Sequence, residues 1–357
     1  MDHLSPPPFR SFDGKAQRSV PPFPLLNLRP GSEPCFLTEI ESSPTRCDIL
    51  RFMDEVLADR PLARGPERLF DLTRSGSGKA ARSQLSAFAL LCTGHLILEM
   101  GAWSTAQGPR PMVMRGVVAA AVIALALQLW PNAPRSLARW ALPLVAMASL
   151  VMHALLFPAA ANHAGLLALV FVVLATFDLG DDEEALAARA ALRWLTVIVL
   201  FSTGLQKVLH GTYFHGDFLA WQLAHDARFL SFLQFTVSAD EIARLQALAG
   251  GATDVGTYRS SDVMLLIASN VSYLGELLLP IALVWKRTRA LAIPAAIALF
   301  VLIEAGAREI FFGVLFLNML GLFAERDWIR RALPLSGVLY LLAFSSRMGW
   351  LPGWNLN

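Results

Sequence analysis

Residues 192–217 read LRWLTVIVLFSTGLQKVLHGTYFHGD, an apolar run that ends in a lysine and two histidines. About 23 Å of helix separates Leu192 from Lys207, whereas the hydrocarbon core of a membrane is about 30 Å thick. We therefore expect Lys207 near the far side of the membrane, still below its surface. An ammonium group is costly there, and such residues usually face a bundle interior or a wet cavity. Because burial favours the neutral amine, Lys207 is a candidate base, with snorkelling to the interface as the alternative.

The composition predicts a membrane protein. Of the 357 residues, 55% are hydrophobic and only 16% are charged, and the mean hydropathy is +0.50. These values are too apolar for an ordinary soluble domain, so we predict an all-α, polytopic bundle of transmembrane helices in a lipid bilayer. The net charge of +2 and the lack of a basic stripe with interleaved aromatics argue against a nucleic-acid partner. The cysteines and histidines lack metal-ligand spacing, so no metal site is predicted.

The chain divides into a tail, a membrane domain and a short end. Residues 1–80 are predicted to form a cytoplasmic N-terminal tail, proline-rich at first, with no cleavable signal peptide. Apolar residues recur at helical spacing in 48–59, which predicts a short amphipathic helix on the membrane surface or against the cytoplasmic loops. A loose helix without a role is the alternative. Residues 81–350 form the predicted transmembrane domain, and 351–357 form a C-terminal tail.

Nine apolar runs are candidate membrane spans. They cover residues 84–103, 116–130, 140–158, 163–180, 192–210, 263–285, 290–305, 310–323 and 333–346. The runs 116–130, 310–323 and 333–346 are shorter than an upright span needs, so polar flanks extend them or they are partly re-entrant. The expected number of spans is therefore eight or nine.

Basic residues in the short loops predict the orientation. They are Arg74, Lys79 and Arg82 before the first span, Arg135 and Arg139 after the second, Lys286, Arg287 and Arg289 after the sixth, and Arg326, Arg330 and Arg331 after the eighth. All of them lie on one side if the N-terminus is cytoplasmic and the C-terminus is outside, in a bacterial inner membrane. This orientation brings His163 and Lys207 toward the outer side. It also makes 211–262 an extracytoplasmic loop, which we expect to cover the outer opening as a lid.

Three segments, in order along the chain, carry a family resemblance. They are Asn162-His163, Phe201-Ser-Thr-Gly204-Leu-Gln-Lys207 followed by an aromatic residue and Gly216, and Gly275-Glu276-Leu-Leu-Leu-Pro280 followed by Lys286-Arg287-Thr288-Arg289. Together they resemble the motifs of the vitamin K-dependent gamma-carboxylase family, whose bacterial branch is often called the HTTM domain. The resemblance covers residues 80–330.

The resemblance implies an enzyme that uses Lys207 as a base on a reduced quinone of the menaquinone or vitamin K type, with His163 as its hydrogen-bonding partner. In that family, oxygenation of the quinone drives carboxylation of protein glutamate. Candidate substrate-binding residues are Asn162, Gly204, Tyr213, Phe214 and Glu276.

The chain departs from the family in two places. Its segment 299–304 lacks the histidine that the family often has there, and the sequence ends at Asn357 without room for the large extracytoplasmic domain. We therefore expect a pocket for a quinone or another lipophilic molecule rather than carboxylation of a protein.

Several of these residues also have structural interpretations. His95 and Glu99 share one helical face near the outer side, and we expect them to pair with Lys207. A carboxylate there would hold the lysine charged and oppose its use as a base. Glu276 is the other carboxylate that could form this structural pair with Lys207. It is alternatively a cap for a neighbouring helix or a brace for the basic helix end, and Gly204 a site of close helix packing.

Two classes of function therefore remain open. The first is a membrane enzyme, in which Lys207 is unpaired and lines a cavity. The second is a non-catalytic scaffold, binding or immunity-type component, in which Lys207 is paired and its surroundings are packed.

Overall fold

The computed structural model describes residue 72 and residues 77–105, 111–156, 162–250, 255–324 and 328–351. Within these residues all regular structure is helical, without a strand, so the predicted all-α class is confirmed there. Both the predicted amphipathic helix at 48–59 and almost all of the predicted N-terminal tail lie outside the described residues, as do residues 352–357.

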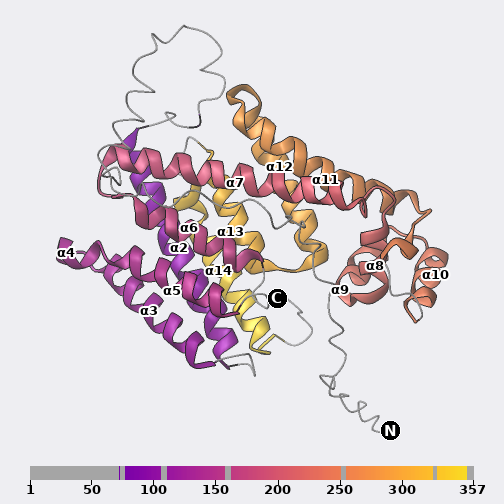
Figure 1. The fold of residues 1–357 in the computed structure, drawn as a ribbon, viewed down its shortest axis with the longest axis horizontal. Coiled ribbons are helices and arrows are strands. Elements are labelled where there is room, and N and C mark those ends of the chain that lie inside the picture. The colour runs from indigo at the N-terminus through magenta and orange to yellow at the C-terminus, as the bar shows by residue number, and fades with distance from the viewer. Residues whose placement is uncertain are drawn as a thin grey trace, which may run out of the picture. The chain divides into compact units, whose positions relative to one another are not determined.

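Each of the nine apolar runs corresponds over most of its length to a helix (Figure 1). The helices are α2 (Gly78–Thr105), α3 (Pro111–Leu129), α5 (Ala141–Leu156), α6 (Asn162–Thr176), α7 (Asp182–His210), α11 (Val263–Val284), α12 (Lys286–Ala307), α13 (Ile310–Gly321) and α14 (Trp328–Arg347), with the short α4 (Arg135–Ala138) before α5. In the described part of the chain, six helices are long and apolar enough to cross a membrane, namely α2, α3, α5, α7, α11 and α12. Of the others, α6 and α13 are apolar but shorter, and α14 has 20 residues but is less apolar, with three arginines.

Helix α7 begins ten residues earlier than its apolar run predicts. The Asp181 side chain caps it by accepting hydrogen bonds from the backbone N–H groups of Glu183 and Glu184, a typical N-terminal arrangement. The extra turns carry Arg189, and Arg193 follows as the second residue of the apolar run; a charged side chain at either position would ordinarily be expected to be exposed. Both arginines are instead almost fully buried, at 1% and 0% exposure.

Hydrogen bonds compensate these buried arginines. The Nε group of Arg193 donates to the Leu322 carbonyl at 2.8 Å, at the end of α13, and its Nη1 donates to the Leu72 carbonyl at 3.1 Å. Arg189 donates to Oε1 of Gln84 in α2 at 3.2 Å. Burying a guanidinium group is tolerated only with such partners. The two arginines therefore join the start of α7 to the start of α2 and the end of α13.

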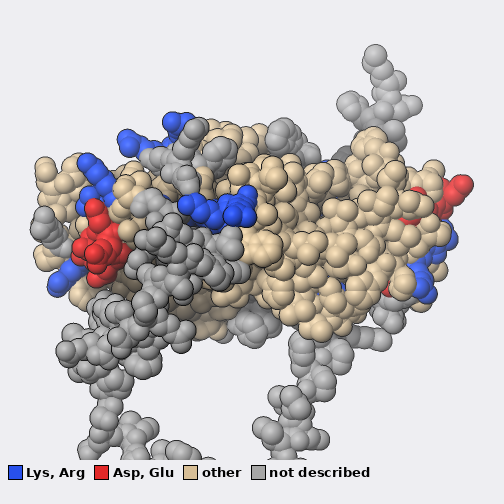
Figure 2. All heavy atoms as spheres, turned by 90° about the horizontal axis from the view of Figure 1, so that it is seen from above, with Lys and Arg blue, Asp and Glu red and all other residues tan. Residues whose placement is uncertain are grey.

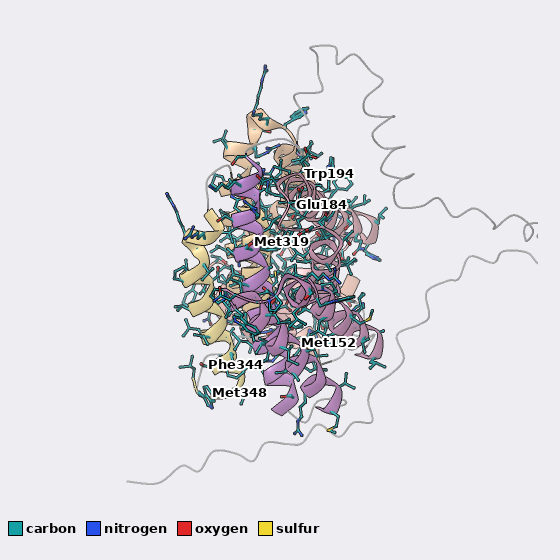
Figure 3. All side chains as sticks on the ribbon, turned by 90° about the vertical axis from the view of Figure 1, so that its left-hand side faces the viewer. Met152, Glu184, Trp194, Met319, Phe344 and Met348 are labelled. Carbon is teal, nitrogen blue, oxygen red and sulfur yellow. The ribbon has the colours of Figure 1, made fainter. Side chains whose placement is uncertain are left out.

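The contacts also show which ends of several helices lie together. At the end of the bundle around Arg193, which we call the Arg193 end, the starts of α2 and α7 meet the end of α13. The opposite end, called the Lys207 end, holds the end of α7, the start of α11 and the end of α12. Arg347, the last residue of α14, lies over the ring of Trp103 near the end of α2, at 4.9 Å. Figure 3 looks along the molecule from the Arg193 end and shows Met319, which is fully buried, among the surrounding helices.

Much of the helix surface is uncharged and exposed, as a lipid-facing surface would be. Figure 2 shows a broad uncharged face between charged side chains that gather toward its left and right margins. Exposed tryptophans stand directly beside helix ends, with Trp130 after α3, Trp140 before α5 and Trp285 after α11. Indole rings favour the boundary between lipid and water, so these residues are typical of an interfacial belt.

The described residues of segment 211–262 contain short helices that were not predicted from the sequence. They are α8 (Asp217–His225), α9 (Ala227–Leu233), α10 (Ala239–Ala249) and the 3-10 helix η2 (Val255–Tyr258). These elements bury a core of their own, which includes Leu223, Leu245 and Tyr258, together with Leu265 of α11. Helices α8, α9 and η2 are only nine, seven and four residues long, too short for a clear hydrophobic period. Helix α10 has a clear amphipathic pattern, ADEIARLQALA, which the prediction overlooked.

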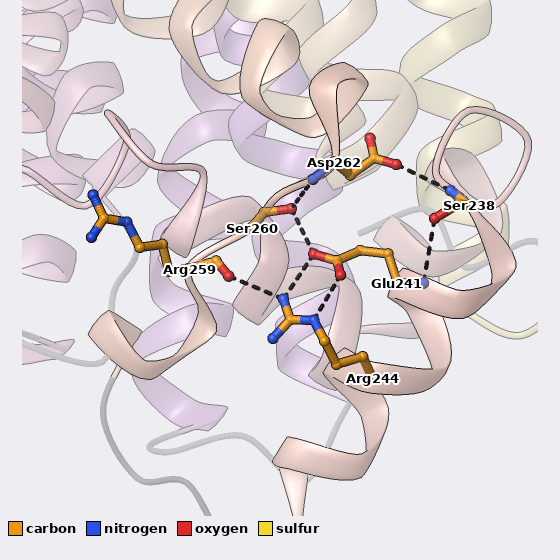
Figure 4. A network of polar contacts seen from close by, with 6 residues as sticks. All are labelled: Ser238, Glu241, Arg244, Arg259, Ser260 and Asp262. Atoms are coloured by element: carbon orange, nitrogen blue, oxygen red, sulfur yellow. Dashed lines mark hydrogen bonds and ion pairs between the residues drawn. The ribbon is translucent and has the colours of Figure 1, made fainter.

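A polar network fastens α10 to the start of α11 (Figure 4). Arg244 donates to both carboxylate oxygens of Glu241, at 2.7 and 2.8 Å, and the Ser260 hydroxyl donates to Glu241 Oε1 at 2.7 Å. The hydrogen bonds from Arg244 hold the pKa of Glu241 below its usual value. The Ser260 hydroxyl in turn accepts from the backbone N–H of Asp262, which caps α11. The short helices of this segment are thus held in place by charge-assisted hydrogen bonds as well as by their core.

Gly204 allows α7 and α11 to touch. A Cβ atom at Gly204 would lie 2.9 Å from the backbone nitrogen of Leu277 and 3.0 Å from the carbonyl carbon of Glu276. Backbone atoms cannot move aside as a flexible side chain can, so the helices would have to separate. This confirms the interpretation of Gly204 as a site of close helix packing.

We predict that Gly204→Ala destabilises the protein by about 1–3 kcal/mol, because the added methyl group overpacks the contact with α11. Thermal unfolding in detergent measures the effect. Gly94→Ala in α2 is the matched control, since no atom lies within 4 Å of its added Cβ, and it should be neutral or slightly stabilising. Equal melting temperatures for the Gly204 variant and the parent would contradict the prediction.

Candidate functional site

Lys207 lies three residues before the end of α7, and its ammonium group has three partners. Its Nζ atom is 2.6 Å from Glu276 Oε1 and 3.3 Å from the Ser272 hydroxyl, both on α11. The same atom lies 4.7 Å from the centre of the Tyr213 ring, in a cation–π contact. An ammonium group has three N–H donors, and this arrangement offers each of them an acceptor. Each donor of the Lys207 ammonium group thus has a partner in the site.

Glu276 is the more buried member of the pair. Its side chain is 7% exposed, whereas that of Lys207 is 20% exposed. Glu276 is thirteen residues from the start of α11, or about 20 Å along the helix axis, so the pair is level with the middle of α11. The site is accordingly deeper along α11 than its position near the end of α7 indicates. Water or a ligand would reach it on the lysine side.

Tyr213 comes from a turn between two glycines with positive φ angles. Gly211 ends α7 at φ 72° and Gly216 precedes α8 at φ 74°, a conformation that glycine adopts without strain. The Ser269 hydroxyl donates to the Tyr213 carbonyl at 2.7 Å, and the Tyr213 ring stacks on Phe218. Burial, together with the nearby charge of Glu276, raises the pKa of Tyr213. Tyr213 is thus a fixed, neutral ring over the lysine.

Phe214 lies beside the site rather than in it. Its ring meets that of Tyr273 on α11 edge to face, with centroids 5.3 Å apart, and the side chain is 40% exposed. The Tyr273 hydroxyl donates to the side-chain oxygen of Asn270 at 3.0 Å. The rings of Phe214 and Tyr273 therefore form an aromatic surface next to the Lys207 site.

The structure brings most of the predicted site residues together. The Lys207 ammonium group contacts both Glu276 and the ring of Tyr213, and Gly204 packs against the backbone of Glu276. Asn162 and His163 begin α6, but their side chains lie outside the described ones. The hypothesis that His163 and Lys207 share a cavity therefore stays a prediction.

Of the two carboxylates predicted as partners of Lys207, Glu276 forms the pair and the expectation for Glu99 was wrong. Glu99 Oε2 lies 3.1 Å from Nε2 of His95, and Nδ1 of His95 lies 3.2 Å from the Tyr340 hydroxyl on α14. All three of these side chains are nearly fully buried. This second polar cluster ties α2 to α14 and leaves Glu276 as the carboxylate partner of Lys207. The alternatives in which Glu276 caps a neighbour or braces the basic helix end are replaced by that ion pair.

Sequence reasoning missed Ser272, although a signal for it exists. Ser269, Ser272 and Glu276 recur at spacings of three and four residues in an otherwise apolar helix. Polar residues at that spacing share one helical face, which in a membrane faces other helices. The same pattern would have predicted that this face of α11 meets Lys207.

The fold and the site together define a helical protein with several candidate membrane spans and a buried lysine–glutamate pair between two of them. Comparison with known proteins adds no relative, since no protein-family model, no curated protein and no solved structure matches the chain. The residues of the chain itself therefore carry the functional interpretation.

Loss of the lysine alone should be strongly destabilising. Lys207→Met leaves Glu276 buried without a counter-charge, at a cost of about 3–5 kcal/mol, and adding Glu276→Gln should restore most of the loss. The fraction of folded protein after heating in detergent measures both effects. Ser272→Ala is the control, because it removes one long hydrogen bond worth about 1 kcal/mol. A Lys207→Met protein as stable as its parent would show that the pair contributes little.

Proposed function

We propose that this chain is an integral membrane enzyme of the gamma-carboxylase-like type, in which Lys207 and Glu276 act together as an acid–base pair on a reduced quinone or another lipophilic hydroxyl compound. The observation that carries the proposal is the 2.6 Å contact between Nζ and Oε1, with the lysine as the more exposed partner. The sequence motifs around Lys207 and Glu276 support the same assignment.

The pair changes how Lys207 would serve as a base. While Glu276 is ionised, the ammonium form of the lysine is favoured, and an ammonium group cannot accept a proton. Transfer of one proton from Nζ to Oε1 gives a neutral amine beside a carboxylic acid, and low polarity favours that uncharged pair. The amine then accepts the proton of a hydroxyl group that approaches from the exposed side. Lys207 is thus the base, and Glu276 stores its first proton.

The surroundings suit a planar, lipophilic substrate. The Tyr213 ring shows that the space over the ammonium group accommodates an aromatic ring, and Phe214 with Tyr273 offers a further aromatic surface beside it. A reduced quinone is both aromatic and a hydroxyl donor, and it supplies the redox chemistry that the side chains lack. Either the Tyr213 ring moves aside or the substrate ring packs against Phe214.

A second candidate function is a non-catalytic one. All three donors of Lys207 have acceptors, and Gly204 packs directly on the backbone beside Glu276. Both features also fit an ion pair that only holds α7 to α11 in a scaffold or binding protein.

Quinol-dependent oxygen consumption by the purified protein separates the two candidates. The double variant Lys207→Met/Glu276→Gln keeps a neutral, similarly sized pair, so it should fold. As the enzyme loses its base, its turnover should fall by about 10²-fold or more. Organic extraction of the parent protein should in addition yield bound quinone. If the parent lacks both quinone and activity, or the double variant keeps full activity, the scaffold interpretation is favoured.

We further propose nine membrane-crossing helices in a bacterial inner membrane, with the N-terminus in the cytoplasm and the C-terminus outside. The nine helices that match the apolar runs support nine crossings, and the basic residues Lys79, Arg82, Lys286 and Arg287 support the orientation. A fusion of a cytoplasmic reporter after Trp285 should be active, and one after Asn357 should be inactive. The reverse result would invert the assignment and move the Lys207 end to the cytoplasmic side.

A further inference from the structure

Apart from Glu183 and Glu184 in the first turn of α7, the described membrane helices carry three glutamates, and the three differ in how their charge is balanced. Glu99 of α2 is hydrogen-bonded to His95 at 3.1 Å, and Glu276 of α11 is paired with Lys207 at 2.6 Å. Glu304 of α12 has no such partner. Neither of its carboxyl oxygens is accessible to solvent, and neither makes a hydrogen bond within the described part of the chain.

Glu304 is held against α13 by a glycine. A Cβ atom at Gly313 would lie 2.6 Å from Cγ and 2.7 Å from the carboxyl carbon of Glu304, so the carboxyl group occupies the space that a side chain at 313 would fill. Gly306, two residues after Glu304, packs in the same way against Phe229 of α9. The carboxyl group is therefore enclosed where α12 and α13 meet, close to their contact with α9.

The charged groups nearby do not neutralise it. Glu309 lies in the turn before α13; its backbone N–H faces the carboxyl group of Glu304 without closing a hydrogen bond, and its own charge repels an ionised Glu304. The Arg308 guanidinium donates to the Ser231 hydroxyl of α9 at 2.5 Å, and Arg228 of α9 is bound to Asp226.

Helix α13 carries no titratable side chain in Ile310–Gly321. The positive end of the α13 helix dipole favours an ionised Glu304 to some extent. Burial of the carboxylate without a hydrogen-bonding partner disfavours the ionised form more strongly.

We propose that Glu304 is a proton-binding site, whose carboxyl group is protonated inside the membrane and exchanges its proton with the aqueous side at the Lys207 end. Only three residues follow Glu304 before α12 ends. The shortest path for the proton from its carboxyl group to water therefore leads past the turn around Arg308. An ionised Glu304 would need hydration and would repel Glu309. Release of the proton should therefore loosen the contact of α9 with Gly306. This site is independent of Lys207 and of any reaction there.

Dicyclohexylcarbodiimide, a membrane-permeant reagent for protonated carboxyl groups, tests the proposal on the parent protein in liposomes. The acid adds its O–H across one C=N bond of the reagent, and the product rearranges to a stable N-acylurea without another reactant. Peptide mass spectrometry then compares the three glutamates within one sample. At neutral pH we expect about tenfold more adduct at Glu304 than at Glu99 or Glu276, because among these three only Glu304 lacks a hydrogen-bonding or ion-pair partner for its carboxyl group. The labelling should fall as the pH is raised.

Two variants serve as controls. Glu304→Gln should lose the adduct without gaining one elsewhere, and the neutral amide should leave the stability unchanged or raised. Lys207→Met should add labelling at Glu276, because its carboxyl group then lacks a partner. Adduct at Glu99 or Glu276 in place of Glu304, equal labelling of all three, or no adduct at Glu304 would each overturn the proposal. Because the parent protein alone yields this comparison, the result does not depend on how well the variants fold.

Discussion

The ion pair between Lys207 and Glu276 is the interaction on which the centre of this structure depends. Two charges taken out of water cost several kcal/mol each, and only short contacts and further hydrogen bonds recover that cost. The 2.6 Å distance requires α7 and α11 to approach closely, which in turn requires Gly204 at their crossing. The cation–π contact brings Tyr213 over the lysine and so orders the turn that leads into α8. The need to pair these two buried charges thus determines how closely α7 and α11 cross, why a glycine stands at the crossing and how the following turn is ordered.

The Arg193 end satisfies the same requirement by other means. Arg189 donates to a glutamine side chain, and Arg193 donates to backbone carbonyls. The last carbonyl groups of a helix lack a hydrogen-bond donor within the helix. A guanidinium group that donates to such a carbonyl therefore satisfies the hydrogen-bonding needs of both groups. Arg289 does the same at the end of α11, where it donates to the Leu283 carbonyl. Arginine suits this role because its donors form a planar fork. The bundle is therefore joined by charge pairing near Lys207 and by helix capping near Arg193.

The sequence predicted the helices well and their partners poorly, for physical reasons. A membrane span is a local property, since every backbone group must be satisfied within the segment, and each of the nine apolar runs corresponds over most of its length to a helix. The start of α7 was missed because hydropathy counts Arg189 as exposed, whereas its partner Gln84 is 105 positions away in the chain. That Lys207 pairs with Glu276 rather than with Glu99 is likewise determined by tertiary packing. Both carboxylates were near enough in depth, and helix packing alone decides which one meets Lys207.

Charge balance within the bundle also bears on what Lys207 can do. A lysine facing an apolar cavity would lose its proton to lower the cost of burial, and it would be a ready base. Here the proton is held by a carboxylate, a hydroxyl and a ring, so the base has to be formed by moving that proton to Glu276. Such a transfer changes no net charge within the site, and for that reason it costs less in a membrane than removal of either charge alone. If Lys207 is catalytic, Glu276 is consequently as necessary to the chemistry as the lysine, and substituting either residue should abolish the same step.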